Sequence, residues 1–218
     1  RFINYQAPLR TENPVRRGEI SDIIEGVSGE LCLTSHDGLF RFYPSTKVLL
    51  HYLYDPENVN GISDNWAFKI IYDHTEQAWI ALPNSSINRI NPFSNSFRRI
   101  QKNINVSSSL SNNSIGCFYT DSRGNFWVGC YGSGGLNRTA MNNHKVYENF
   151  EHYAFDADDL NSICGDRIHA IYEDRDQTLW VGTWDGLNRF DYNTNNFTRY
   201  QYDPDDNTSI SYIVRSIY

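Results

Sequence analysis

Short runs of alternating apolar and polar residues recur along the chain, separated by Gly, Asn, Asp and Ser. In residues 167–203 four such runs follow one another: RIHAIYED, LWVGTW, LNRFDYN and FTRYQYD. Alternation with a period of two predicts β-strands, and Asp185-Gly186 predicts a tight hairpin because glycine tolerates the positive φ of such turns. We therefore expect four antiparallel strands here and little helix anywhere in the chain.

The same pattern occurs three more times. LWVGTWDGLNRF (179–190) corresponds to LCLTSHDGLFRF (31–42), AWIALPNSSINRI (78–90) and FWVGCYGSGGLNR (126–138). A repeat of nearly 50 residues is typical of a propeller blade of four antiparallel strands. The predicted fold is therefore an all-β β-propeller with blades at about 20–54, 66–100, 114–155 and 167–203.

The two ends of the chain resemble parts of further blades. Residues 2–5 (FINY) match the outer strand FTRY (197–200), and SIY at 216–218 matches the inner strand AIY (170–172). We expect 2–5 to be the outer strand of a preceding blade and 213–218 the inner strand of a following one. Residues 1–218 would then be one fragment of a larger, seven-bladed propeller, with a compact four-bladed ring as the alternative.

Composition narrows the function. The formal net charge is −7, from 26 acidic and 19 basic residues, which argues against a nucleic-acid surface. No apolar run approaches the roughly 18–20 residues of a membrane span. The six histidines and four cysteines show no metal-site or redox spacing, so we expect no metal and no cofactor.

Two finer points concern sulfur and calcium. If the turn between their strands centres on Arg123-Gly124, Cys117 and Cys130 face each other, and a disulfide is then an alternative to two core thiols. The repeated links YDPENVNGIS (54–63), FDADDLNSIC (155–164) and YDPDDNTSIS (202–211) are acidic. They lack the spacing of a calcium loop, so turn chemistry is the favoured interpretation, with calcium as the alternative.

The motif order IYxD, LWVGT, GLNRFD and FxxY resembles the two-component-regulator propeller repeat found in the periplasmic sensor regions of bacterial hybrid two-component systems. Residues 170–200 match nearly throughout, whereas Ala81 replaces the expected glycine in the second unit, and Cys32 and Thr34 replace Trp and Gly in the first. The resemblance covers essentially the whole chain.

The resemblance implies a non-enzymatic role in signal transduction. Such sensors recognise oligosaccharides released from glycans, form homodimers and pass the signal to a histidine kinase in the same polypeptide. They are periplasmic parts of inner-membrane proteins, anchored through segments outside this chain. This chain would bind an oligosaccharide, or support its binding, together with the remainder of the sensor.

Residues that recur in every unit are interpreted as scaffold. The tryptophans of the second strands are expected to be core anchors, and the recurring arginines to stack on aromatic rings or pair with Asp73, Asp121 or Asp174. These structural anchors are Trp79, Trp127, Trp180, Arg41, Arg89, Arg138 and Arg189.

Ligand recognition is expected where the units differ, on the loops of one face. The turns between second and third strands share a face with the links between blades. The candidates offer flat rings for sugar C–H groups, or hydrogen bonds for hydroxyls: Trp184, Asp185, Tyr131, Trp66, Asn84 and His36. The alternative for each ring is packing against a neighbouring blade.

Two other functions are compatible with a propeller. A glycoside hydrolase or polysaccharide lyase needs paired carboxyl groups, and Asp37 and Asp185 are the candidates, although both also suit turns. A protein-interaction scaffold is the second. We expect no catalytic residue in this chain.

Overall fold

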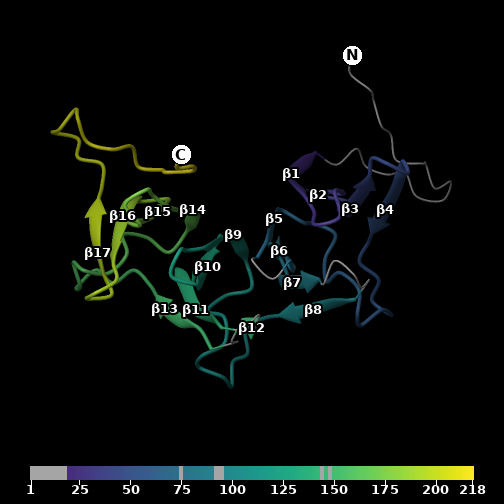
Figure 1. Cartoon of the computed structure of the whole chain (residues 1–218). Coiled ribbons are helices and arrows are strands. Elements are labelled where there is room, and N and C mark those ends of the chain that lie inside the picture. The colour runs from purple at the N-terminus through teal and green to yellow at the C-terminus, as the bar shows by residue number, and fades with distance from the viewer. Residues whose placement is uncertain (1–18, 74–75, 91–95, 143–144, 147–148) are drawn as a thin grey trace, which may run out of the picture.

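The computed structural model describes residues 19–73, 76–90, 96–142, 145–146 and 149–218 (Figure 1). These ranges contain strands and turns, and no helix within them is long and apolar enough to cross a membrane. The strands form four separate antiparallel sheets, which confirms the predicted all-β propeller fold. The predicted strand at 2–5 lies outside the described residues.

Each sheet is one blade, in which consecutive strands pair. Blade one consists of β1 (Ile20–Glu25), β2 (Leu31–Ser35), β3 (Gly38–Tyr43) and β4 (Val48–Tyr52). Blade two consists of β5 (Lys69–Tyr72), β6 (Ala78–Leu82), β7 (Ser86–Ile90) and β8 (Phe97–Ile100). Blade three consists of β9 (Ile115–Thr120), β10 (Asn125–Cys130), β11 (Leu136–Asn142) and β13 (Glu151–Tyr153), with the short β12 (Lys145–Val146) also paired to β11. Blade four consists of β14 (Ile168–Glu173), β15 (Leu179–Thr183), β16 (Gly186–Asp191) and β17 (Asn196–Tyr200).

The four blades lie side by side along an open arc (Figure 1). The first strands, β1, β5, β9 and β14, face the inside of the arc and contact one another in order, whereas the last strands of the blades lie outside. Among the described residues, the first and fourth blades lie at opposite ends of this arc (Figure 1). The alternative of a compact four-bladed ring is therefore wrong, because the sheets do not close on each other.

Three hydrophobic cores fill the spaces between consecutive blades. The core between blades two and three contains Trp79 and Phe126, whose ring centroids are 4.6 Å apart. The core between blades three and four contains Trp127 and Phe190, at 5.1 Å. Blades two and three thus bury their second-strand tryptophans against the next blade, as expected for aromatic residues that carry much apolar area.

The three tryptophans are held in the same way. The indole Nε1–H donates to the carboxylate of the aspartate six residues earlier, at 2.6 Å for Trp79, 2.7 Å for Trp127 and 2.8 Å for Trp180. Trp79 and Trp127 are fully buried, whereas Trp180 is half-buried and packs on Tyr200 of its own blade. The bond satisfies the buried indole N–H, which would otherwise cost free energy.

The recurring arginines follow the predicted stacking more closely than the predicted pairing. Arg89 lies over Trp79 and Arg138 over Trp127, both at 5.4 Å, and Arg41 lies over Tyr43 at 5.6 Å. The aspartates predicted as their partners instead accept the indole N–H groups. Arg189 departs from the pattern because it is exposed.

Blade one replaces this tryptophan arrangement with an ion pair. Its second strand has Cys32 at the Trp position and Gly26 at the Asp position. The carboxylate of Glu30 accepts a 2.7 Å bond from Arg41 Nη2, and both side chains are buried. A Cβ at position 26 would lie 2.5 Å from the Glu30 carboxyl, so a glycine is needed there. Gly26 stands where the other blades have an aspartate, and the Glu30 carboxyl fills the space that a side chain at position 26 would need.

The links between blades are built from turns, as predicted. Asp156 and Asp159 each accept the backbone N–H of the residue two positions later, at 2.9 Å. Such Asx turns use the acidic oxygens within the loop itself. The link is fastened to blade four by the buried Asn188, whose Oδ1 accepts the Cys164 N–H at 2.8 Å. Asn88 and Asn137 hold the preceding links at Ser63 and Ser111.

Cys117 and Cys130 lie on paired strands but do not face each other. Cys117 faces Gly129, because the β9–β10 pairing is centred on Arg123 and not between Arg123 and Gly124; Cys130 faces Ile115, since the register shifts after Gly129. The disulfide geometry considered for Cys117 and Cys130 is therefore wrong: both thiols are free, and they belong to different cores.

Residues 213–218 form no strand in this structure. Val214 lies against blade four, where its N–H donates to the Thr183 carbonyl at 3.0 Å. An inner strand would pair with the second strand of its own blade, so a place in a following blade stays a prediction.

Candidate functional site

The turns between second and third strands meet the inter-blade links on one face, which we call the loop face. Gly38 N–H donates to the carbonyl of Asn65, and Gly135 N–H to that of Asp166. The turns of blades one and four share a design: Asp37 N–H donates to Ser35 Oγ at 2.9 Å, and Asp185 N–H to Thr183 Oγ1 at 3.0 Å. The following glycines have φ of 101° and 132°, as tight hairpins require.

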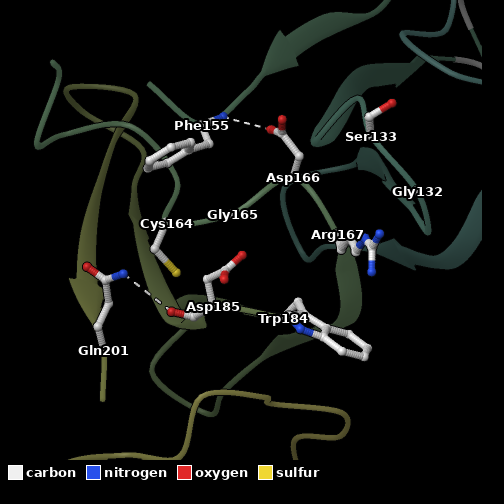
Figure 2. Close-up of a pocket in the computed structure, with 10 residues that line it drawn as sticks. All are labelled: Gly132, Ser133, Phe155, Cys164, Gly165, Asp166, Arg167, Trp184, Asp185 and Gln201. Carbon is white, nitrogen blue, oxygen red and sulfur yellow. Dashed lines mark hydrogen bonds between the residues drawn. The ribbon is translucent and has the colours of Figure 1, made fainter. Parts of the chain in front are cut away.

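A pocket of about 800 Å³ opens on the loop face at the seam of blades three and four (Figure 2). Trp184 and Asp185 come from the β15–β16 turn, Asp166 and Arg167 from the link, and Gln201 from the end of β17. Gly132, Ser133, Phe155, Cys164 and Gly165 complete its wall. The structure thus brings together two of the predicted site residues with polar groups from two further segments.

The pocket has two sides (Figure 2). Gln201 and Cys164 lie on one side, Arg167 and Trp184 lie together on the side of Gly132, and the Asp185 side chain lies between the two groups. The Gln201 side chain donates to the backbone carbonyl of Asp185 at 3.4 Å, which orders its side of the pocket. One wall therefore offers hydrogen-bonding groups and the other a ring with a cation.

A row of rings continues from Trp184 across the seam. Trp184 and His169 have centroids 5.6 Å apart, and His169 lies 5.6 Å from Tyr131 of blade three. Arg167 lies over Trp184 at 5.4 Å. Trp184 and Tyr131 keep 38% and 42% of their surface exposed, so each ring retains a face that a ligand can reach.

The remaining predicted residues lie elsewhere on the loop face. His36 and Trp66 meet at the seam of blades one and two, with centroids 5.1 Å apart. Asn84 is exposed in the β6–β7 turn and is not in the lining of the pocket. The predicted set is thus divided between two seams and a separate turn.

Sequence reasoning missed Arg167, His169, Asp166 and Gln201. His169 replaces Gly116 of blade three and Phe68 of blade two, so it also breaks the repeat. The predicted site residues all come from turns and links, whereas His169 belongs to an inner strand. A comparison of the first strands position by position would have found it.

The His169 imidazole should titrate below its ordinary pKa of 6.5. Burial lowers the pKa first, and the positive charges of Arg215 and Arg167 lower it further. Because the folded-state pKa lies below the unfolded value, the contribution to stability is present above 6.5 and is lost as the pH falls through the folded-state pKa.

An NMR titration of the His169 imidazole measures whether its pKa is lowered. Arg215→Gln should raise the pKa of His169, whereas Arg175→Gln, in the β14–β15 turn at the opposite end of the strands, should leave it unchanged. A pKa at or above 6.5 in the unmodified protein would contradict the expectation.

Solved structures with a similar fold were found, whereas no curated protein sequence matches the chain. The extracellular domain of BT3049 from B. thetaiotaomicron, described as a hybrid two component system, aligns with a TM-score of 0.71 at 20% identity, over 91% of this chain and 26% of that one. Virginiamycin B lyase from Staphylococcus aureus aligns with a TM-score of 0.62 at 15% identity, over 91% and 60%. The chain thus spans about a quarter of the first protein and 60% of the second.

These similarities, together with the four meander sheets, define the fold as a β-propeller. Residues 109–132 and 162–185 match the family model of the two component regulator propeller. Each matched segment runs from the end of a link, through a first strand, to the turn after the second strand. These two segments, in blades three and four, therefore match two-component regulator propeller repeats, which confirms the resemblance seen in the sequence.

Proposed function

We propose that this chain is the ligand-binding part of a sensor in a hybrid two-component system. The sensor recognises an oligosaccharide at the seam of blades three and four and passes the signal to a histidine kinase in the same polypeptide. The regulator propeller repeats support the sensor role, and one observation carries the ligand class: an exposed tryptophan and several hydrogen-bonding side chains share one loop-face pocket.

The chemistry of the pocket suits a sugar. The exposed face of Trp184 can cover the C–H groups of a pyranose ring, and the Asp185 carboxylate and the Asp166 carboxylate can accept hydrogen bonds from hydroxyls. A volume of about 800 Å³ is in the range of small-ligand sites. The proposal includes a periplasmic location, an inner-membrane anchor outside this chain and a homodimeric sensor.

Trp184→Ala tests the pocket. The affinity for a bound oligosaccharide should fall by about tenfold or more, because loss of a central aromatic anchor costs above ~1 kcal/mol. Isothermal calorimetry of the full-length protein against a panel of plant and host glycan oligosaccharides measures this. Tyr54→Ala, an exposed ring on the first link, is the matched control and should bind normally. Binding of no oligosaccharide, with no change in kinase output, would end the proposal.

The positions of Asp37 and Asp185 do not support the alternative that the chain is a glycoside hydrolase or polysaccharide lyase. Asp37 and Asp185 belong to the turns of blades one and four, which lie at opposite ends of the arc (Figure 1). Glycoside hydrolysis uses two carboxyl groups about 5–10 Å apart across one cleft. The interaction-scaffold alternative is tested by the same calorimetry, since it predicts no sugar binding.

A further inference from the structure

The first strands of blades three and four each contain a bulge at the end that meets the loop face. The bulged residue is Gly116 in blade three and His169 in blade four, since the pairing with the second strand shifts past each of them. Phe68 has the equivalent position in blade two, directly before β5. A bulge re-aims the side chain of its extra residue, and bulges are frequent next to functional sites. Blades two and four thus place a ring at this point, and the first strand of blade three places none.

Tyr131 fills the place that Gly116 leaves open. It belongs to the β10–β11 turn, and a Cβ at position 116 would lie 3.2 Å from the Tyr131 Cβ and 3.3 Å from its Cδ2. The Tyr131 ring centroid lies 6.2 Å from that of Phe68 in blade two and 5.6 Å from that of His169 in blade four. A side chain at position 116 would crowd Tyr131, so the glycine lets this ring bridge its two neighbours.

This series of rings continues into the pocket at the seam of blades three and four, which we call the seam pocket. The centroids of His169 and Trp184 are 5.6 Å apart, and Trp184 lines the pocket. Gly132, which follows Tyr131 in the chain, lines the same side (Figure 2). We give the name ring row to Phe68, Tyr131, His169 and Trp184. The ring row leads from the seam of blades two and three into the seam pocket.

The ring row lies outside the packed interior. In the part of the chain that the structure describes, none of its four members belongs to the three hydrophobic cores between the blades. Tyr131 and Trp184 are 42% and 38% exposed, and Phe68 and His169 are half-buried. Exposed apolar surface that is continuous across several segments marks a place of contact with a ligand or a partner.

The inclination of the rings favours a chain of sugar units over a single sugar. The interplanar angle is 55° between Phe68 and Tyr131, 87° between Tyr131 and His169, and 35° between His169 and Trp184. A single sugar ring cannot lie against planes that differ so much, whereas successive units of a flexible chain can each meet one of them.

Hydrogen-bonding groups lie among the rings. His169 Nε2 is buried and has no hydrogen-bond partner among the described residues, and such atoms call for an explanation such as a ligand or a water molecule. The Arg167 guanidinium lies over the Trp184 ring at 5.4 Å. Ring faces next to polar groups suit a carbohydrate, because each sugar unit has apolar C–H groups and hydroxyls.

From this arrangement we infer that the sensor binds a linear oligosaccharide of several units, with one end in the seam pocket and the following units on Tyr131 and Phe68. The inference rests on the proposed function and narrows its ligand to a chain that extends beyond the pocket. Trp184 belongs to both the pocket and the ring row, so it contacts short and long chains alike. Tyr131 and Phe68 contact only the longer ones, and the ring row therefore selects the ligand by its length.

Series of graded length test the inference by calorimetry on the full-length protein. Linear malto-, cello-, xylo- and arabino-oligosaccharides are compared, each from the disaccharide to the hexasaccharide. In the series that binds, the affinity should rise by about tenfold or more from the disaccharide to the tetrasaccharide, because a well-placed aromatic contact has an effect of this size. The affinity should then level off, since further units extend beyond Phe68. The arm that binds identifies the sugar and its linkage.

Ring-removing variants assign the residues. Tyr131→Ala and Phe68→Ala should each lower the affinity for the hexasaccharide by about tenfold, with a much smaller effect on the disaccharide, whereas Trp184→Ala should weaken both. Tyr131→Phe, which restores a ring, should recover the affinity that Tyr131→Ala loses. Tyr54→Ala removes a ring of similar exposure, 46%, on the link between blades one and two, and is the matched control. Disaccharide binding by each variant shows that its pocket is folded.

Two results overturn the inference while the proposed sugar-sensing function stands. In the first, the disaccharide binds as tightly as the hexasaccharide, which confines the ligand to the seam pocket. In the second, Tyr131→Ala and Phe68→Ala weaken the disaccharide as much as the hexasaccharide, which means that the two rings only support the fold of the pocket. If no sugar of any series or of the glycan panel binds, the proposed function fails together with the inference.

Discussion

Replacement of Trp127 by alanine is expected to lower the free energy of unfolding by about 3–5 kcal/mol, the cost typical of a large aromatic-to-alanine change in a core. Trp127 is fully buried and contacts rings of its own blade and of blade four. Its substitution leaves a cavity across the seam. Asp121 keeps hydrogen bonds from Asn125 and Tyr192, so the loss comes mainly from packing.

Trp180→Ala is the matched control, since this indole has the same aspartate bond but is half-buried. It should cost less, about 1–2 kcal/mol, which is an ordinary value for a partly buried site. Urea denaturation of the two variants measures the difference. Equal losses at both positions would contradict the view that packing against the next blade, and not the indole bond, provides the stability.

Glu30→Ala is expected to cost about 3–5 kcal/mol, because it leaves the Arg41 guanidinium buried without its carboxylate. The side chains of Arg41 and Glu30 are 5% and 0% exposed, so water screens the attraction between their charges only weakly. The double variant Glu30→Leu with Arg41→Met should be markedly more stable than Glu30→Ala, because apolar replacement of both partners leaves no uncompensated charge. A double variant as unstable as the single one would refute this account.

Acid unfolding gives a second check on the same pair. Burial raises the pKa of Glu30, but the hydrogen bonds from Arg41 and from the backbone N–H groups of Glu30 and Ser28, with the charge of Arg41, together outweigh burial and hold the pKa below 4.5. A lowered folded-state pKa means that the stabilisation is present above 4.5 and is lost as the pH falls through the folded-state pKa. Stability curves of the double variant should therefore be flatter in this acidic range.

Sequence patterns predicted the blades well because their determinants are local. Alternation specifies which face of a strand is apolar, and Asp-Gly pairs specify hairpins such as Asp185-Gly186. The repeated tryptophans identified second strands, and all three occupy equivalent positions. The predicted pairing of Cys117 with Cys130 is wrong because the turn between β9 and β10 is centred on Arg123, which places Cys117 opposite Gly129.

The site was predicted only in part. Trp184 and Asp185 are adjacent in the sequence, and their departure from the repeat was enough to single them out. The predicted residue His36 was correctly placed on the loop face but lies at another seam. Arg167 and Gln201, which also line the pocket, come from a link and from the end of a fourth strand, so they could not be related to each other from the sequence.

The sequence by itself determined the repeat, the strands and the face on which the blades differ, because each depends on neighbouring residues in one chain segment. Only the tertiary structure decided which of those differing residues share a pocket. The physical reason is that each seam joins two blades, so the groups that meet there come from strands, turns and links far apart in the sequence.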